Sequence, residues 1–178
     1  MKTIIVSIAL FILNFNQSKL YEISFELQDG SIFQMSSLFG KKVMVVICDS
    51  DFPDLKQLSF TDSAARLDKH LYSIIIVPAT DLSKTDSSSG KMDNKFKDIN
   101  NNNYIISKPM PVKKDTGGYQ HPLLKWLTNV DENGHFDRDV ESEGQIFLVD
   151  EKGILFGVHP GLTKVSVISE VLSQQINE

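Results

Sequence analysis

Two short apolar runs constrain the fold of this chain more than any other feature. Residues 43–48 (VMVVIC) and 73–78 (SIIIVP) have the length of a strand and show no alternation with charged residues. Such runs are typical of strands that are buried on both faces of a parallel or mixed sheet. Between them, apolar residues recur at nearly helical spacing from 55 to 71, and Asp51 with Pro53 provides a cap and a first turn. The pattern predicts a strand–helix–strand unit of an α/β protein.

The segments on either side predict two hairpins, one more strand and two more helices. Alternation of apolar and polar residues around Asp29-Gly30 is a strong signal for a β-hairpin. The predicted elements are a hairpin at 23–33, a short strand at 104–106, a helix at 121–127 with Pro122 in its first turn, a hairpin at 145–158 and a terminal helix from Thr163. Residues 79–103 are polar and predict a loop. Together these elements predict an α/β fold with a mixed central sheet of four or five strands flanked by helices.

The first 18 residues have the layout of a secretory signal peptide. Lys2 precedes an apolar run at 3–15, and a polar stretch follows at 16–19. The run is shorter than the roughly 20 residues that cross a bilayer, so a retained anchor is the weaker interpretation. We therefore expect residues 1–18 to be a signal peptide and residues 21–178 to form a single domain. The protein is expected to be secreted or to reside in the lumen of the secretory pathway.

The composition narrows the classes of partner and cofactor. The chain of 178 residues is acidic, with a net charge of −5. Because little of its surface would neutralise phosphates, we expect no nucleic-acid partner and no membrane partner beyond the signal segment. The chain has no glycine-rich phosphate loop, and its four histidines are scattered without the spacing of a helical metal site. We therefore expect no cofactor and no metal.

The sequence offers one redox candidate and one acidic cluster. Cys48 is the only cysteine, which excludes an internal disulfide, and it lies in an apolar strand beside Asp49. Both features raise a thiol pKa, so we interpret Cys48 as a buried structural residue and only a weak redox candidate. Asp49, Asp51 and Asp54 form an acidic loop at a strand–helix junction. Calcium binding there is an alternative to capping and solvation, but Pro53 and the missing loop glycine oppose it.

Five segments between residues 21 and 178 together resemble the glutathione peroxidase family, a branch of the thioredoxin-fold superfamily. They occur in the family's order with similar spacing: YEISF at 21–25 with Asp29-Gly30, SSLFGKKV at 36–43, IIIVP at 74–78, GGYQHPLLKWL at 117–127 and FLVDEKG at 147–153. The resemblance implies a thioredoxin-like fold with an N-terminal hairpin. It also implies an ancestral chemistry in which a cysteine or selenocysteine attacks a peroxide.

The positions that carry this chemistry in the family are replaced in this chain. The resemblance places the nucleophile at Phe52, the supporting glutamine at or near Thr85, and the tryptophan and asparagine at Ser142 and Glu143. Phenylalanine has no nucleophile, and a glutamate opposes the ionisation of a nearby thiol. Cys48 lies about 13 Å before Phe52 along an extended chain, too far to serve the same pocket. Set against the family pattern, these replacements imply a domain that has lost the family's catalytic residues.

Two functional hypotheses follow. The first is a secreted scaffold that has kept the fold, has lost peroxidase activity and acts by binding a protein partner. The sequence identifies neither that partner nor the oligomeric state. The second is a thiol peroxidase or disulfide-linked redox protein of the oxidative-stress response that uses Cys48. The accessibility of Cys48 discriminates between them, since a thiol catalyst must meet its substrate.

Overall fold

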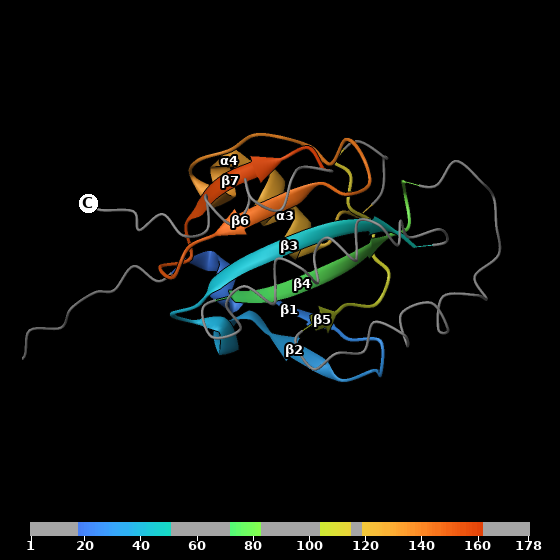
Figure 1. Cartoon of the computed structure of the whole chain (residues 1–178), viewed down its shortest axis with the longest axis horizontal. Helices are drawn as coiled ribbons and strands as arrows, with labels where there is room; N and C mark the ends of the chain where they lie inside the picture. The colour runs from blue at the N-terminus through green and yellow to red at the C-terminus, as the bar shows by residue number, and fades with distance from the viewer. Residues whose placement is uncertain (1–17, 51–71, 83–103, 115–118, 162–178) are drawn as a thin grey trace, which may run out of the picture.

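The computed structural model describes residues 18–50, 72–82, 104–114 and 119–161, and its elements are labelled as in Figure 1. The helical elements are η1 (Lys19–Glu22), η2 (Met35–Leu38), α3 (Pro122–Thr128) and α4 (Val130–Asn133). The strands are β1 (Ser24–Glu26), β2 (Ile32–Gln34), β3 (Lys42–Asp49), β4 (Tyr72–Ala79), β5 (Tyr104–Ile106), β6 (Ile146–Val149) and β7 (Leu155–His159). The predicted helices that begin near Asp51 and at Thr163 lie outside the described residues, as does most of the predicted loop at 79–103.

Five strands form the main sheet in the order β5-β4-β3-β6-β7 (Figure 1). β3 and β5 run parallel to β4, whereas β6 runs antiparallel to both β3 and β7. The two apolar runs therefore pair in the centre of the sheet, with Cys48 in register with Pro78. This arrangement confirms the predicted α/β fold with a mixed sheet and the predicted burial of both central strands.

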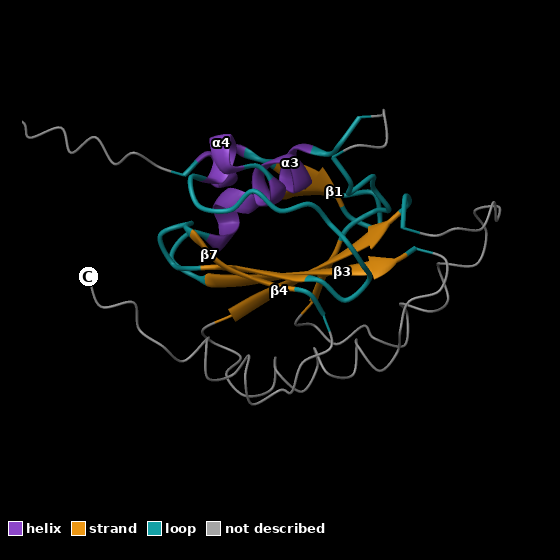
Figure 2. Ribbon diagram, turned by 90° about the horizontal axis from the view of Figure 1, so that it is seen from above, coloured by secondary structure: helices purple, strands orange, loops and turns teal. Residues whose placement is uncertain are grey.

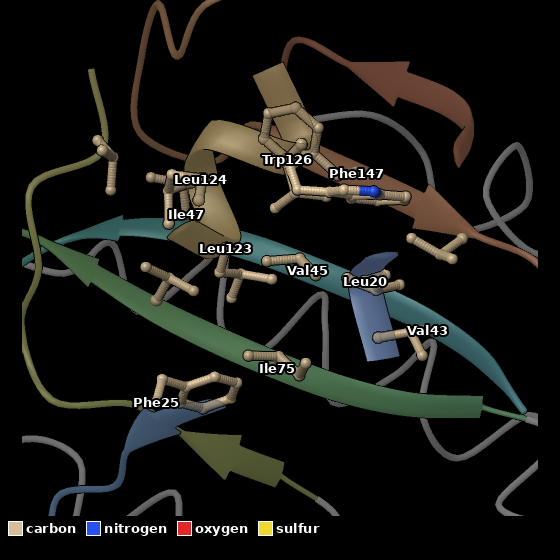
Figure 3. Packing of buried hydrophobic residues seen from close by; sticks show 14 of the residues in the cluster. Leu20, Phe25, Val43, Val45, Ile47, Ile75, Leu123, Leu124, Trp126 and Phe147 are labelled. Atoms are coloured by element: carbon tan, nitrogen blue, oxygen red, sulfur yellow. The ribbon is translucent and has the colours of Figure 1, made fainter. Parts of the chain in front are cut away.

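Side chains of β3 alternate between the two faces of the sheet, and both faces are buried. Every second residue from Val43 to Ile47 belongs to the main core cluster, which also contains the apolar side of α3: Leu123, Leu124, Trp126 and Leu127 (Figure 3). Figure 2 shows α3 and α4 as a layer over one face of the sheet. The residues between, from Met44 to Cys48, are exposed by 1% or less. Burial on both sides explains why this strand carries no polar side chain from Val43 to Cys48.

The helical layer begins and ends at capping residues. The ring of His121 accepts a hydrogen bond from the Leu123 N–H at 3.2 Å, and Pro122 occupies the first turn of α3, as predicted. Asn129 then caps α4 by accepting from the Asp131 N–H at 3.0 Å. Gly134 ends this short helix in the left-handed conformation at a φ of 78°. The structure thus adds the short helix α4 to the predicted helix at 121–127.

Both predicted hairpins are present. β1 and β2 pair antiparallel around a turn in which the Asp29 carboxylate accepts from the N–H and the hydroxyl of Ser31. β6 and β7 pair antiparallel around a turn held by Asp150, whose carboxylate accepts from the Lys152 and Ile154 N–H groups at 2.9 and 2.7 Å. Local side-chain hydrogen bonds of this kind are the reason that aspartate favours such turns.

The packed domain begins slightly before the predicted start at Tyr21. The hydroxyl of Ser18 caps η1, and Leu20 is fully buried in the main core cluster. A fully buried leucine stabilises a fold by about 1.5–3 kcal/mol, so it belongs to the domain. Residues 1–17, most of the predicted signal peptide, lie outside the described residues.

Candidate functional site

The carboxyl end of β3 is where the family resemblance places the reactive centre, and two segments meet there. The Ile47 N–H donates to the Gln145 carbonyl at 3.0 Å, and the Gly144 N–H donates to the Ile47 carbonyl at 2.8 Å. The segment just before β6 is therefore hydrogen-bonded to Ile47, near the carboxyl end of the central strand β3. This pairing brings Glu143, the position matched to the family's asparagine, close enough to Cys48 to act on it electrostatically.

Cys48 is a free thiol with 1% of its surface exposed. Its Sγ donates to the carbonyl of Val77 on the neighbouring strand, at 3.7 Å. The burial predicted from the apolar run is confirmed. With 1% of its surface exposed, the thiol has almost no contact with dissolved peroxide in this structure.

The electrostatics around Cys48 oppose its ionisation. Burial raises the pKa of the Cys48 thiol well above its usual range, and the negative charges of Glu143 and Asp49 raise this pKa further. Catalytic cysteines need the opposite environment, a helix N-terminus or a nearby cation that stabilises the thiolate. At neutral pH the group is a protonated thiol, which is a poor nucleophile.

Of the four positions matched to the family's catalytic residues, the structure describes two. Glu143 is half-buried and close enough to Cys48 for its charge to act on the thiol. Ser142 is exposed, and its hydroxyl donates to the Pro160 carbonyl at 3.3 Å. Phe52 and Thr85 lie outside the described residues. That the chain has no catalytic residue, with Cys48 as a weak redox candidate, stays a prediction.

Gln145 holds the loop that carries Ser142 and Glu143. This glutamine is 1% exposed, and its side-chain amide accepts from the Glu141 N–H at 2.9 Å and donates to the Asp139 carbonyl at 3.0 Å. A buried amide with both groups satisfied fixes the path of a loop. The sequence signal was a lone polar residue at the start of an apolar strand, and we predicted only a strand from it.

Asp81 stabilises the loop that follows β5. It lies just after β4, in the segment Ala-Thr-Asp at 79–81. Its carboxylate accepts from the Val112 N–H at 3.0 Å and from the Lys113 N–H at 2.9 Å. Charge-assisted hydrogen bonds to backbone N–H groups are stronger than neutral ones. Asp81 thus serves the structure of the loop, a role that the sequence did not predict.

The described residues contain no group of three or more His, Cys, Asp or Glu side chains that could hold a metal ion. His121 is used as a helix cap, and burial lowers the pKa of its ring. Of the acidic cluster, only Asp49 is described, while Asp51 and Asp54 lie outside. Among the described residues, no helix has the length and apolar character needed to span a bilayer.

Known proteins share the fold and part of the sequence. No family model matches the chain. The glutathione peroxidase-like peroxiredoxin HYR1 of Saccharomyces cerevisiae is 26% identical over 165 residues, which cover 90% of this chain and 98% of the relative. The crystal structure of T. cruzi GPX1 matches with a TM-score of 0.65 and 17% identity, covering 86% of this chain and 93% of that one. The apo structure of Trgpx has a TM-score of 0.65 and 16% identity, covering 86% and 92%.

A second group of structures shares the fold at greater distance. The structure of MTB dsbF matches with a TM-score of 0.55 and 13% identity, covering 88% of this chain and 97% of that chain. These likenesses show a thioredoxin-like fold, as the order of elements predicts.

Proposed function

We propose that this glutathione peroxidase-like, thioredoxin-fold protein has lost peroxidase chemistry and acts as a secreted binding or structural scaffold. The observation that carries the proposal is the state of the chain's only thiol. Cys48 is 1% exposed, lies inside the central strand and has a raised pKa. A peroxidase of this kind needs an accessible thiolate, and the chain has no second sulfhydryl to supply one.

The environment of Glu143 supports the same proposal. A negative charge at this position acts against a thiolate at the end of β3, whichever residue provides the sulfur. Where the family pattern has a neutral asparagine, this chain thus has a group that opposes the first step of the reaction. The fold by itself does not fix function, whereas these side chains determine whether a thiolate can form.

The proposed location follows from the N-terminal segment. A positive residue, an apolar run and a polar exit within residues 1–18 favour export, and the acidic composition disfavours nucleic acids and anionic membrane surfaces as partners. We infer a protein partner outside the cell or in the secretory lumen.

The alternative is a thiol peroxidase or disulfide-linked redox protein of the oxidative-stress response that uses Cys48. The name of the yeast relative, a glutathione peroxidase-like peroxiredoxin, favours it. It requires local opening of β3 to expose the thiol before each reaction.

Consumption of hydrogen peroxide and of a lipid hydroperoxide separates the two functions. The purified protein is assayed with glutathione and with thioredoxin as reductants, next to Cys48→Ser and an active family peroxidase as a positive control. The scaffold proposal predicts the blank rate for both chains. Turnover that is present in the native chain and absent in Cys48→Ser would establish the alternative.

A further inference from the structure

A cavity of about 1020 Å³ lies at the end of the sheet opposite Cys48. It is lined by the start of η1, by Phe39, by residues 131–135 at the end of α4 and by the β6–β7 turn at 151–154. Since β3 begins at Lys42, this cavity is about 20 Å from Cys48 along the strand. It is therefore separate from the site that the family resemblance indicates.

One wall of the cavity is rigid and apolar. The rings of Phe39 and the buried Tyr21 pack in a T-shaped arrangement, with centroids 5.3 Å apart at 64°, yet 59% of Phe39 is exposed. Gly153 packs so tightly beneath that a Cβ there would come within 2.6 Å of Tyr21 and 2.9 Å of Ser18. A large exposed aromatic ring on a fixed support is a common anchor for a binding partner.

Two of the three carboxylates that line the cavity have ion-pair partners. Glu132 pairs with Lys19 at 3.2 Å and with Lys125 at 3.6 Å, and Glu151 pairs with Lys42 at 3.7 Å. These carboxylates are already compensated.

Asp131 is different. Among the described residues, its carboxylate has neither a hydrogen bond nor an ion pair, and the residue is exposed. The cavity thus presents a solvent-exposed carboxylate that has no protein partner among the described residues, together with an exposed aromatic ring, and both attract a cation.

We propose that this cavity binds a peptide segment of a partner protein that presents an arginine or lysine beside an apolar residue. The basic group would pair with Asp131 and lie over Phe39, and the apolar residue would pack against Phe39 and Ile154. The volume exceeds what a single side chain fills, which favours a peptide of several residues over a small solute. This inference extends the proposed scaffold function by assigning its contact surface.

The test uses the full-length protein and two short probes. N-acetyl-Leu-Arg-Leu-amide is titrated against N-acetyl-Leu-citrulline-Leu-amide, which keeps the shape and removes the charge. Binding is followed by amide chemical shifts in two-dimensional NMR. We expect shifts at residues 131–135 and 151–154 with the arginine probe, and affinity that falls as salt rises. The citrulline probe is expected to bind at least threefold more weakly, roughly the contribution of an exposed cation–π contact with an ion pair.

Two variants and two matched controls localise the binding. Asp131→Asn and Phe39→Ala should each weaken the arginine probe by about two- to fivefold. Glu22→Gln removes an exposed carboxylate outside the cavity, and Tyr119→Ala removes a ring that is 71% exposed elsewhere, so neither should change affinity. The same spectra report whether each variant is folded.

Three results would overturn the proposal: no binding of the arginine probe, equal binding of both probes, or binding that is unchanged in Asp131→Asn and Phe39→Ala. Because the readout is peptide binding and not peroxide turnover, failure here leaves the loss of peroxidase activity standing. Conversely, measurable turnover would refute that loss without changing the peptide result.

Discussion

Raising the pH above about 8.5 should destabilise this protein through Cys48. Folding encloses the thiol at 1% exposure near two carboxylates, which raises its pKa in the folded state. Unfolding returns the thiol to water, where its pKa is about 8.5, so the unfolded chain loses this proton first as the pH rises. The contribution of the neutral thiol to stability is therefore fully present below a pH of about 8.5 and decreases above it.

The size of the effect follows from proton linkage. For one group whose folded pKa lies far above its unfolded value, the slope approaches about 1.4 kcal/mol per pH unit. Between pH values of about 8.5 and 9.5 the free energy of unfolding should fall by about 1 kcal/mol. Burial and the carboxylates of Asp150 and Glu151 also raise the pKa of Tyr21, which adds a loss of the same sign only at higher pH, near the usual tyrosine range of about 10.

Urea unfolding of the native chain and of Cys48→Ala, followed by circular dichroism, measures this difference. The variant should be less stable near neutral pH because it leaves a small cavity, but it should lack the additional alkaline loss. The quantity compared is the change in the free energy of unfolding over this pH interval. An identical pH dependence in the two chains would refute the reasoning, because it would mean that Cys48 ionises equally well in the folded protein.

Three further perturbations test the structure. Iodoacetamide should modify Cys48 in the native protein at least about 1000-fold more slowly than in the urea-denatured chain, because the reaction requires an opening of the fold that costs about 5 kcal/mol or more. Mass spectrometry measures both rates, and a ratio under about tenfold would contradict the burial of Cys48. Gly153→Ala should lower the free energy of unfolding by about 2–3 kcal/mol, because its φ is 80° and a Cβ would lie only 2.6 Å from Tyr21. Gly134→Ala, at a similar φ of 78° but with open space around the new Cβ, should lower it by only about 1 kcal/mol. Equal melting temperatures for these two variants would argue against the packing of Gly153. Asp81→Asn should lower the free energy of unfolding in urea by about 1–2 kcal/mol, because it weakens the hydrogen bonds from the Val112 and Lys113 N–H groups. The control Asp137→Asn removes an exposed ion pair with Lys114 and should change stability by about 0.5 kcal/mol or less. The reverse order of the two effects would refute the role given to Asp81.

The sheet and both hairpins could be predicted because their signals are local. Apolar runs without alternation identified β3 and β4, and the turn residues around Asp29 and Asp150 fixed the hairpins. The thioredoxin-like fold was implied by the resemblance of five segments to the glutathione peroxidase family and not by these local patterns. The strand and turn patterns depend on spacing along the chain, which a single sequence displays directly.

The features that sequence reasoning missed depend on contacts between distant segments. Leu20 lies between the predicted signal peptide, residues 1–18, and the predicted domain start at Tyr21, but it is buried in the core. Asp81 accepts from the backbone N–H of Lys113, which is 32 residues away in the sequence. The partner of Gln145 is the backbone N–H of Glu141, which is near in sequence but lies in a loop without a regular pattern. The cavity beside Phe39 combines four separate segments, and no periodicity marks such a surface.

The oxidation state of Cys48 after treatment of the native protein with hydrogen peroxide tests the central claim most directly. Dimedone traps any sulfenic acid, and mass spectrometry of the Cys48 peptide reads the product, with the urea-denatured chain as the matched control. The account predicts an unmodified thiol in the folded protein and oxidation in the denatured one. Sulfenic acid at Cys48 of the folded protein, formed as fast as in the denatured chain, would contradict it and favour a peroxide-reactive enzyme.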